Sequence, residues 1–346
     1  MSYEKYLRGI KGTEFIQKNR FNRDIGRYKD GALDIPSISG KDLTITIDSK
    51  LQEYGEILMK NKKGAIVAIE PNSGEILSLV SSPSYNPNLL VGRERSKNYF
   101  ELYKDSIYRP LIDKSLLSMF PPGSPFKILV GLTALQEEII TEKSTIYCKG
   151  YYIYGKEKRK INCHCGGGYR NIYNAISLSC NSYFADIYRK TINSQNNTKE
   201  NFDNWSNHIK SFGLGNYLNN DLPIGKKGVV PDSEYYDRWY PDFKWGATTT
   251  ISNSIGQGEI LTTPIQLANM TAAVANEGYY YTPHIIKKID GDTIDVRFKI
   301  PIKTSIDSTH FKTINKALYS VFKSGTGRLL NVPGIEICGK SGTSEN

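Results

Sequence analysis

The first half of the chain holds a clear strand, helix and hairpin pattern. Apolar and polar residues alternate over 43–47, which predicts a short strand, and an amphipathic helix follows over 48–59, with Asp48 as its cap. Two apolar, β-branched segments, 64–70 and 75–81, flank the turn at 71–74. Because glycine in such a turn adopts a positive φ without strain, these segments predict a hairpin.

The rest of the chain predicts helices separated by irregular segments. Apolar residues recur at helical spacing in four segments: 125–140, 173–190, 264–277 and 309–323. Residues 141–170 are predicted to be irregular or short-stranded, and 193–245 to be loops around a short helix. A second hairpin is predicted over 279–289 and 293–300, and a strand over 336–343.

This order of elements indicates the fold class and the domain organisation. Hairpins flanking central helices are typical of an α+β fold with an antiparallel sheet. Residues 1–40 are polar and broken by five glycines, so we expect an extended arm or the remnant of a smaller domain. The predicted organisation is therefore an arm over 1–40 and one domain over 41–346.

Composition narrows the classes of protein. The 346 residues are 39% hydrophobic, which is enough for a large core and excludes a disordered chain. The net charge is +10, but the Lys and Arg residues are scattered and no nucleic-acid motif accompanies them, so no nucleic-acid partner is expected. No apolar segment reaches the roughly 18 residues of a membrane span. If the protein works outside the cytoplasm, we expect its anchor to lie outside this sequence.

Ser124 and Lys127 are the first candidates for chemistry. At the start of a helix, residues three positions apart share a face, so the Lys127 amine is within reach of the Ser124 hydroxyl. A lysine whose pKa is lowered can take the proton of a serine and make it a nucleophile. Taken alone, this spacing far more often marks a capping serine and a surface lysine.

Two further motifs follow in the sequence. Ser179 and Asn181 are separated by one residue, and we read them as a proton shuttle and a hydrogen-bonding group for a substrate amide. After an apolar segment come Lys340, Ser341, Gly342 and Thr343. The lysine offers a cation for a carboxylate, and a glycine on a strand lets a ligand approach the backbone.

In this order, Ser-x-x-Lys, Ser-x-Asn and Lys-Ser-Gly resemble the motif set of the penicillin-recognising acyl-serine enzymes. The resemblance extends over roughly 40–346 and is strongest to class B penicillin-binding proteins, in particular the elongation-type penicillin-binding protein 2. Pro125 stands where the family commonly has Thr, and Ser341 stands where Lys-Thr-Gly is usual. The resemblance implies a penicillin-binding transpeptidase fold, an antiparallel sheet flanked by helices with an all-helical subdomain.

The resemblance also implies a role for each motif residue. Ser124 would attack the D-Ala–D-Ala carbonyl of a stem peptide and form an acyl-enzyme, with Lys127 as its base. Ser179 would relay a proton with the help of Lys340, and Asn181 would orient the donor peptide. Ser341, Gly342 and Thr343, together with Lys340, would bind the terminal carboxylate or its β-lactam mimic. No cofactor is required for this acyl transfer.

Compared with the family, the chain is expected to be truncated at both ends. Residues 1–40 would be the remnant of an N-terminal pedestal, a membrane anchor would precede it, and the remaining core strands and terminal helix would follow Asn346. The implied location is the plasma or inner membrane, with the domain periplasmic, and the implied partner is a membrane glycan polymerase of the elongation machinery. The alternatives are a β-lactamase or D,D-carboxypeptidase of the same superfamily, and a β-lactam sensor or inactive scaffold.

Four of the five cysteines lie close together in the sequence. Cys148, Cys163, Cys165 and Cys180 are predicted as ligands of a structural zinc ion, with His164 as an alternative ligand. A disulfide such as Cys148–Cys163, or free thiols, are the other interpretations. Cys338 is predicted to be a buried thiol on a strand.

Overall fold

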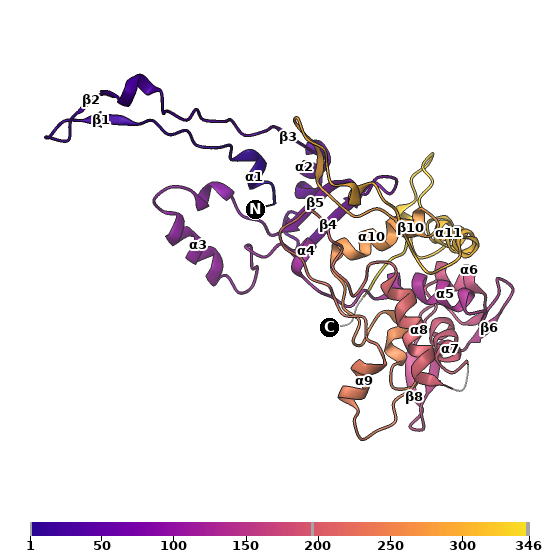
Figure 1. The fold of residues 1–346 in the computed structure, drawn as a ribbon. Coiled ribbons are helices and arrows are strands. Elements are labelled where there is room, and N and C mark those ends of the chain that lie inside the picture. The colour runs from indigo at the N-terminus through magenta and orange to yellow at the C-terminus, as the bar shows by residue number, and fades with distance from the viewer. Residues whose placement is uncertain (1, 195–196, 344–346) are drawn as a thin grey trace.

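A computed structural model describes residues 2–194 and 197–343 (Figure 1). Its α-helices are α1 (Glu4–Leu7), α2 (Ser49–Leu58), α3 (Arg95–Lys104), α4 (Lys114–Leu117), α5 (Lys127–Gln136), α6 (Ile172–Ser177), α7 (Asn181–Ile192), α8 (Thr198–Lys210), α9 (Ser233–Trp239), α10 (Pro264–Ala275) and α11 (Ser308–Lys323). Its 3-10 helices are η1 (Tyr28–Gly31), η2 (Pro87–Leu90), η3 (Ser124–Phe126), η4 (Ile251–Ile255), η5 (Val296–Phe298) and η6 (Arg328–Leu330).

Short antiparallel strand pairs complete the fold. The strands are β1 (Ile16–Lys18), β2 (Asp24–Arg27), β3 (Leu43–Ile45), β4 (Gly64–Ile69), β5 (Ile76–Ser82), β6 (Ile146–Cys148), β7 (Tyr151–Tyr154), β8 (Arg159–Asn162), β9 (Gly168–Arg170), β10 (Tyr279–Tyr280), β11 (Ile286–Ile289) and β12 (Ile302–Lys303). Within the described residues, each sheet has two strands: β1–β2, β3–β11, β4–β5, β6–β9, β7–β8 and β10–β12.

The α+β architecture and several of its elements were predictable. The β4–β5 hairpin pairs Gly64 with Ser82 and Ile69 with Ile76, and Gly74 in its turn has φ +79°. The helix that begins after Asp48 also forms, because the Asp48 carboxylate accepts hydrogen bonds from the first turn of α2. Helices α10 and α11 confirm the predictions over 264–277 and 309–323.

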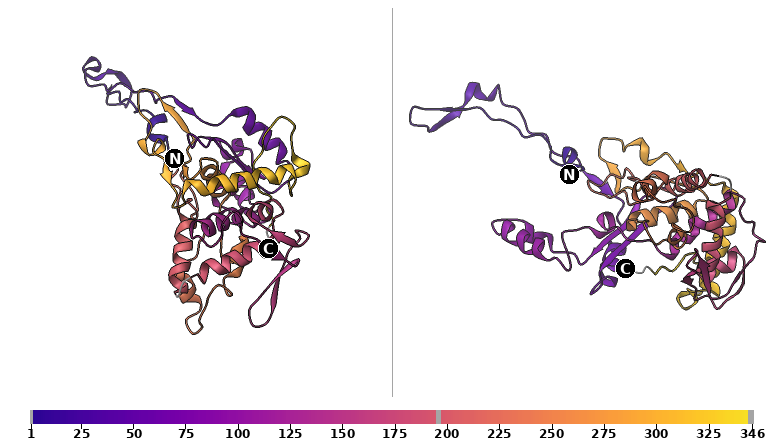
Figure 2. Two further views of the ribbon diagram at one scale, coloured as in Figure 1. Left: turned by 90° about the vertical axis from the view of Figure 1, so that its right-hand side faces the viewer. Right: turned by 90° about the horizontal axis from the view of Figure 1, so that it is seen from below.

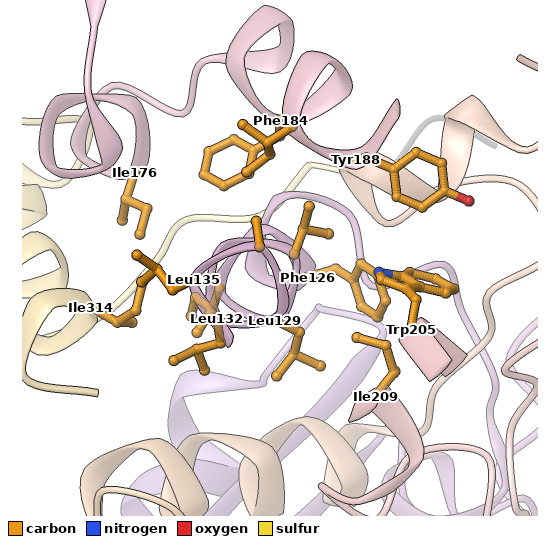
Figure 3. Close-up of a cluster of buried hydrophobic side chains, with 14 of the residues drawn as sticks. Phe126, Leu129, Leu132, Leu135, Ile176, Phe184, Tyr188, Trp205, Ile209 and Ile314 are labelled. Atoms are coloured by element: carbon orange, nitrogen blue, oxygen red, sulfur yellow. The ribbon is translucent and has the colours of Figure 1, made fainter. Parts of the chain in front are cut away.

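Helix α5 lies at the centre of the main hydrophobic core. Figure 3 shows its leucines pointing outward on several sides, toward side chains from α6, α7, α8 and α11. Leu129 and Leu132 are fully buried, and Phe126 packs edge-on against Trp205. Because its apolar residues face several sides, α5 is enclosed by other helices rather than lying on the surface. This enclosure fixes the residues at its N-terminus.

Two segments extend away from this body (Figures 1 and 2). Residues 2–40 form a long antiparallel arm, held by β1 with β2 and by bridges that pair Ile10 with Ile38 and Thr13 with Ile35. This agrees with the predicted extended arm. Helix α3 forms the second projection.

The helix predicted over 173–190 is two helices, α6 and α7, and the single-helix prediction was wrong. They are separated by residues 178–180, where Ser179 adopts φ +55°. A left-handed residue cannot continue a right-handed helix, so the chain turns at this point. The polar residues at 179 and 181 are the sequence signal for the break.

Two other regions differ from the predictions. Residues 193–245 contain the 13-residue helix α8, which buries Phe202, Trp205 and Ile209 on one face. The second hairpin does not form, because β11 pairs with β3, and β10 pairs with β12. Pro283 interrupts the first predicted strand of that hairpin.

The predicted strand over 336–343 is absent among the described residues. This segment is irregular, and its Gly339 N–H donates to the Leu318 carbonyl within α11. A strand is defined by a paired neighbour, and no described segment pairs with this one. Among the described helices, none is long and apolar enough to cross a membrane.

Candidate active site

Ser124 lies at the first position of η3, which leads directly into α5. The turn before it depends on two glycines. Gly123 has φ +61°, and its N–H donates to the carbonyl of Gly256 over 2.8 Å. A Cβ on Gly256 would stand 2.2 Å from the Gly123 carbonyl oxygen, so only glycine allows this contact. The loop after η4 therefore fixes the backbone on which Ser124 stands.

A continuous chain of hydrogen bonds joins the first and second motifs. The Ser179 hydroxyl donates to Ser124 Oγ over 3.0 Å. The amine of Lys127 donates to Ser179 Oγ at 3.1 Å, to the Ser179 carbonyl at 2.9 Å and to Asn181 Oδ1 at 2.5 Å. Ser179 thus stands between the two residues that the sequence pairs as nucleophile and base.

The environment of Lys127 favours the neutral amine. The side chain is fully buried, and this desolvation, followed by the positive charge of Lys340, lowers the pKa of Lys127 to about 7. The neighbouring cysteines act in the opposite direction. A large part of the population is therefore unprotonated near neutral pH and able to accept a proton.

Ser179 is positioned by strained backbone and by the N-terminus of α7. Its φ of +55° is uncommon for a residue with a side chain. The surrounding bonds keep it there: Ser179 N–H donates to the Ile176 carbonyl, and Cys180 N–H donates to the Ala175 carbonyl. Strain of this kind persists where the surrounding structure holds it, often at functional sites.

The third motif reaches the same cleft. Ser341 and Thr343 line a cleft of about 790 Å³ together with Ser124, Ser179 and Asn181. Gly342 comes close to Pro125, since a Cβ on it would lie 3.0 Å from the proline ring. The third motif is therefore next to the residue that follows Ser124.

Lys340 is half-buried at the edge of this group. Its amine donates to the Ser341 carbonyl at 3.1 Å and lies 3.5 Å from Ser341 Oγ. The Ser341 and Thr326 hydroxyl oxygens are 3.0 Å apart. Desolvation lowers the pKa of Lys340 to about 8. Its amine makes no hydrogen bond to Ser124 or Ser179 among the described contacts.

The cleft also has walls that the motifs did not indicate. One is formed by β8 and the residues after it, where Lys160, Asn162 and His164 face the cleft. Another includes Gln257 and Gly258, from the loop after η4. The lining lysine and asparagine lie in a segment with no recognisable motif, so only the fold brings them to the site.

The four clustered cysteines converge on one point. Their sulfur atoms all lie within 4.8 Å of one another, and all four side chains are buried. The closest sulfur pairs are 3.4 Å apart for Cys163 and Cys165, and 3.6 Å apart for Cys163 with Cys180 and Cys165 with Cys148. Four Zn–S bonds of about 2.3 Å in a tetrahedron place sulfurs about 3.8 Å apart, so the group fits a zinc ion.

Three cysteine predictions need correction or refinement. All five cysteines are free, so the alternative of a disulfide such as Cys148–Cys163 is not present in the structure. His164 is exposed in the cleft, outside the thiol cluster, because the strand-like chain turns it away from the two cysteines that flank it. Cys338 is exposed rather than buried, since its segment does not enter a sheet.

The pKa values of two cluster thiols move in opposite directions. The contact between Cys163 and Cys180 lowers the pKa of the Cys163 thiol and raises that of Cys180. Burial raises the pKa of Cys148. The cluster therefore favours one thiolate that its neighbours stabilise by hydrogen bonds, and thiolate is the form that binds metal.

Comparison with known proteins assigns the chain to a class. The profile of the family described as penicillin binding protein transpeptidase domain matches residues 64–346. Because this covers most of the chain, the chain belongs to the penicillin-binding protein transpeptidase family.

Among its relatives, the chain is similar to the peptidoglycan D,D-transpeptidase MrdA. It is 34% identical to the Acinetobacter baumannii protein and 30% identical to that of Escherichia coli K12, in each case over 99% of this chain. These matches cover 50% and 53% of those proteins, so the chain spans about half the length of the curated relatives it matches.

Solved structures of PBP2 proteins are also similar to this chain. The structure of Pseudomonas aeruginosa PBP2 in complex with WCK 5153 has a TM-score of 0.78 and 31% identity, over 99% of this chain and 78% of that chain. The complex of PBP2 and MreC from Helicobacter pylori has a TM-score of 0.82 and 26% identity, over 100% of this chain and 62% of that chain.

Proposed function

We propose that this chain is the catalytic part of an elongation-type peptidoglycan D,D-transpeptidase that also binds β-lactams covalently. The observation that carries the proposal is the hydrogen-bonded series of buried Lys127, Ser179 and Ser124, whose two serines line a wide cleft. A serine, a lysine with a lowered pKa and a bridging hydroxyl are the parts that acyl transfer needs. Membership of the transpeptidase family supports the same activity.

In the proposed first step, Ser124 Oγ bonds to the carbonyl carbon of the penultimate D-Ala. The Ser124 proton passes to Ser179 as the Ser179 proton passes to the neutral amine of Lys127. The protonated Lys127 then returns a proton through Ser179 to the leaving nitrogen, the C–N bond breaks and D-Ala departs. An amine of a second strand attacks the acyl-enzyme, loses a proton along the same path and releases Ser124.

The remaining motif residues hold the substrate in this proposal. The Ser124 and Thr343 N–H groups form the oxyanion hole, and Lys340, Ser341 and Gly342 accommodate the terminal carboxylate with Thr343. Asn181 acts chiefly as a positioning residue, since Oδ1 accepts from Lys127 and Nδ2 donates to the Asn162 carbonyl. The family resemblance assigns Asn181 to orienting the donor peptide, and its amide lines the cleft while each end also has one protein partner.

The thiol cluster is proposed to hold a structural zinc ion. Cys148, Cys163, Cys165 and Cys180 would supply four sulfur ligands, and the ion would take no part in acyl transfer. Cys180 directly follows Ser179, so the cluster would tether the second motif to β6 and to the segment after β8. No cofactor is proposed for the reaction itself.

The proposal extends to location and partners. We propose a periplasmic domain, anchored at the plasma or inner membrane through a preceding segment, with residues 1–40 as part of an N-terminal pedestal. The partner would be a membrane glycan polymerase of the elongation machinery. A similar protein, from Helicobacter pylori, is described in complex with MreC, and another similar structure carries the description of a peptidoglycan synthase complex.

The activity is tested by supplying a peptide that ends in D-Ala–D-Ala together with an amine acceptor. The proposal expects a cross-linked product and free D-Ala, neither of which forms with Ser124→Ala. Hydrolysis of the peptide or rapid turnover of penicillin, without a cross-linked product, would instead indicate a carboxypeptidase or β-lactamase. Stable penicillin labelling without transfer would indicate a sensor, and no labelling would indicate a scaffold.

A further inference from the structure

The wall formed by β8 has polar groups that the proposed acyl transfer does not use. Lys160, Asn162 and His164 line the same cleft as Ser124 and Ser179. None of the three belongs to the motifs that bind the terminal carboxylate. A binding cleft generally fixes the orientation of its ligand with a few such polar groups.

This wall is tied firmly to the reacting residues. The Asn162 carbonyl accepts a hydrogen bond of 2.8 Å from Asn181 Nδ2, and the other end of that amide accepts from Lys127. The next residue, Cys163, is buried in the thiol cluster, and its N–H donates to the Gly150 carbonyl at 2.8 Å. The backbone of the wall is therefore placed relative to Ser124 before any substrate arrives.

Lys160 contributes a positive charge to this wall. Its amine lies 4.9 Å from the centre of the Tyr151 ring across the β7–β8 hairpin, which favours one position of a flexible side chain. Among residues 2–194 and 197–343, no carboxylate lies within 4 Å of it, whereas its neighbour Arg159 pairs with Glu157. A positive charge held at the edge of a cleft attracts a negatively charged part of the ligand.

We propose that Lys160 forms a subsite for an internal carboxylate of the stem peptide, separate from the site of its terminal carboxylate. This inference rests on the proposed function. The terminal carboxylate is assigned to residues 340–343, and Lys160 belongs to a different segment that meets the same cleft. A substrate with two carboxylates would then meet two separate segments of the chain, and a second charged contact of this kind selects for peptide sequence.

The test uses peptides ending in D-Ala–D-Ala that protect Ser124 from labelling by fluorescent penicillin. One peptide has a free internal carboxylate, and the other has that carboxylate amidated. With the unmodified chain, we expect the free acid to protect at about fivefold lower concentration, the effect of one partly exposed ion pair. In Lys160→Gln this difference disappears, and in Lys160→Arg it is retained.

Lys156→Gln, at the exposed turn of the same hairpin, is the matched control and should keep the difference. Equal protection by the two peptides with the unmodified chain, or a difference that survives in Lys160→Gln, would overturn the subsite. Loss of penicillin labelling in the unmodified chain would contradict the proposed function instead. An unchanged melting temperature of Lys160→Gln shows that the variant is folded.

Discussion

Burial decides the chemistry of Lys127. An ammonium ion loses its hydration inside a protein, so the neutral amine becomes relatively more stable and the pKa falls. Here three oxygen acceptors from residues 179 and 181 hold the amine in place, while burial and Lys340 lower its pKa to about 7. The sequence alone suggests a base at this position, but a buried amine with this pKa depends on the helices packed around it.

The first prediction concerns the pH dependence of acylation by a β-lactam. The base must be neutral, so the rate should rise about tenfold per pH unit below pH 7 and level off above it. The proposed role of Lys340 in binding the carboxylate needs its protonated form, so its pKa of about 8 should make the rate fall again at higher pH. Stopped-flow measurement of acylation from pH 5 to about 10 checks this profile.

Lys127→Arg is the control for that profile. Arginine keeps its charge at every accessible pH, so the rate should fall by about a hundredfold or more and lose its rising limb. A rising limb that is unchanged in this variant would show that another group is the base.

The second prediction concerns Ser179, whose hydroxyl is the only described link between Ser124 and Lys127. Replacing Ser179 by Ala interrupts the proton path, so acylation should slow by about a hundredfold while the melting temperature changes little. Ser194→Ala, after the C-terminus of α7, is the matched control. If acylation by Ser179→Ala stays within about twofold of the unmodified chain, the hydroxyl relay is wrong.

At the scale of elements, the nucleophile is positioned by a contact between two turns. The turn before η3 meets the loop after η4 through the hydrogen bond from Gly123 to Gly256, with no room for a side chain on Gly256. The approach of two backbones determines where Ser124 points. The local sequence around Gly123 does not specify this contact, because its partner Gly256 lies more than 130 residues later in the chain.

The third prediction is that Gly256→Ala disrupts this contact. The added methyl group would meet the Gly123 carbonyl, so acylation should fall by about tenfold or more and the chain should melt at a lower temperature. Gly291→Ala is the matched control, because Gly291 has a similar φ of +64° but nothing within 4 Å. Equal effects of the two substitutions on acylation would mean that backbone strain, and not the contact, explains the result.

The fourth prediction concerns the thiol cluster that lies against the start of α7. The purified protein should contain about one equivalent of zinc, and a chelator should lower its melting temperature by about 5 °C or more. Cys163→Ser should have the same effect, while Cys338→Ser, the exposed cysteine outside the cluster, should have none. A metal-free protein whose melting is insensitive to chelator would exclude the zinc site.

Elements with strong local signals were predictable, and those set by distant partners were not. The Asp48 cap and the turn at Gly74 act through neighbouring residues, so α2 and the β4–β5 hairpin follow from the sequence. By contrast, β11 pairs with β3 across more than 200 residues, and the break at Ser179 is a left-handed residue in an otherwise helical pattern. Tertiary pairing overrides local preference at β11, and at Ser179 local hydrogen bonds act together with the bond from Lys127 to the Ser179 carbonyl.

In the candidate site, too, some features were predictable from the sequence and others were not. The motifs identified Ser124, Lys127, Ser179 and Asn181, and the structure brings these four into one hydrogen-bonded group. The order along that group, with Ser179 in the middle, could not be derived from spacing. Nor could the contribution of Lys160, because nothing in its local sequence distinguishes it from the other lysines of a basic hairpin.

Across the whole molecule, the site lies where separate parts of the chain meet around one buried helix. Helix α5 is enclosed by α6, α7, α8 and α11; Lys127 is its first residue, and Ser124, at the start of η3 just before it, lines the cleft. The second motif arrives from the start of α7 and the third from the segment after α11. The packed core therefore supplies the rigidity that a preorganised site requires.

The central claim is that Ser124 is the acylated nucleophile. It is tested most directly by incubating the chain with penicillin, measuring the intact mass and locating the modified residue by fragmentation of peptides. We predict one penicillin adduct per chain, on Ser124, and none in Ser124→Ala. An adduct on any other residue, or an unmodified Ser124 in a folded chain, would contradict the account.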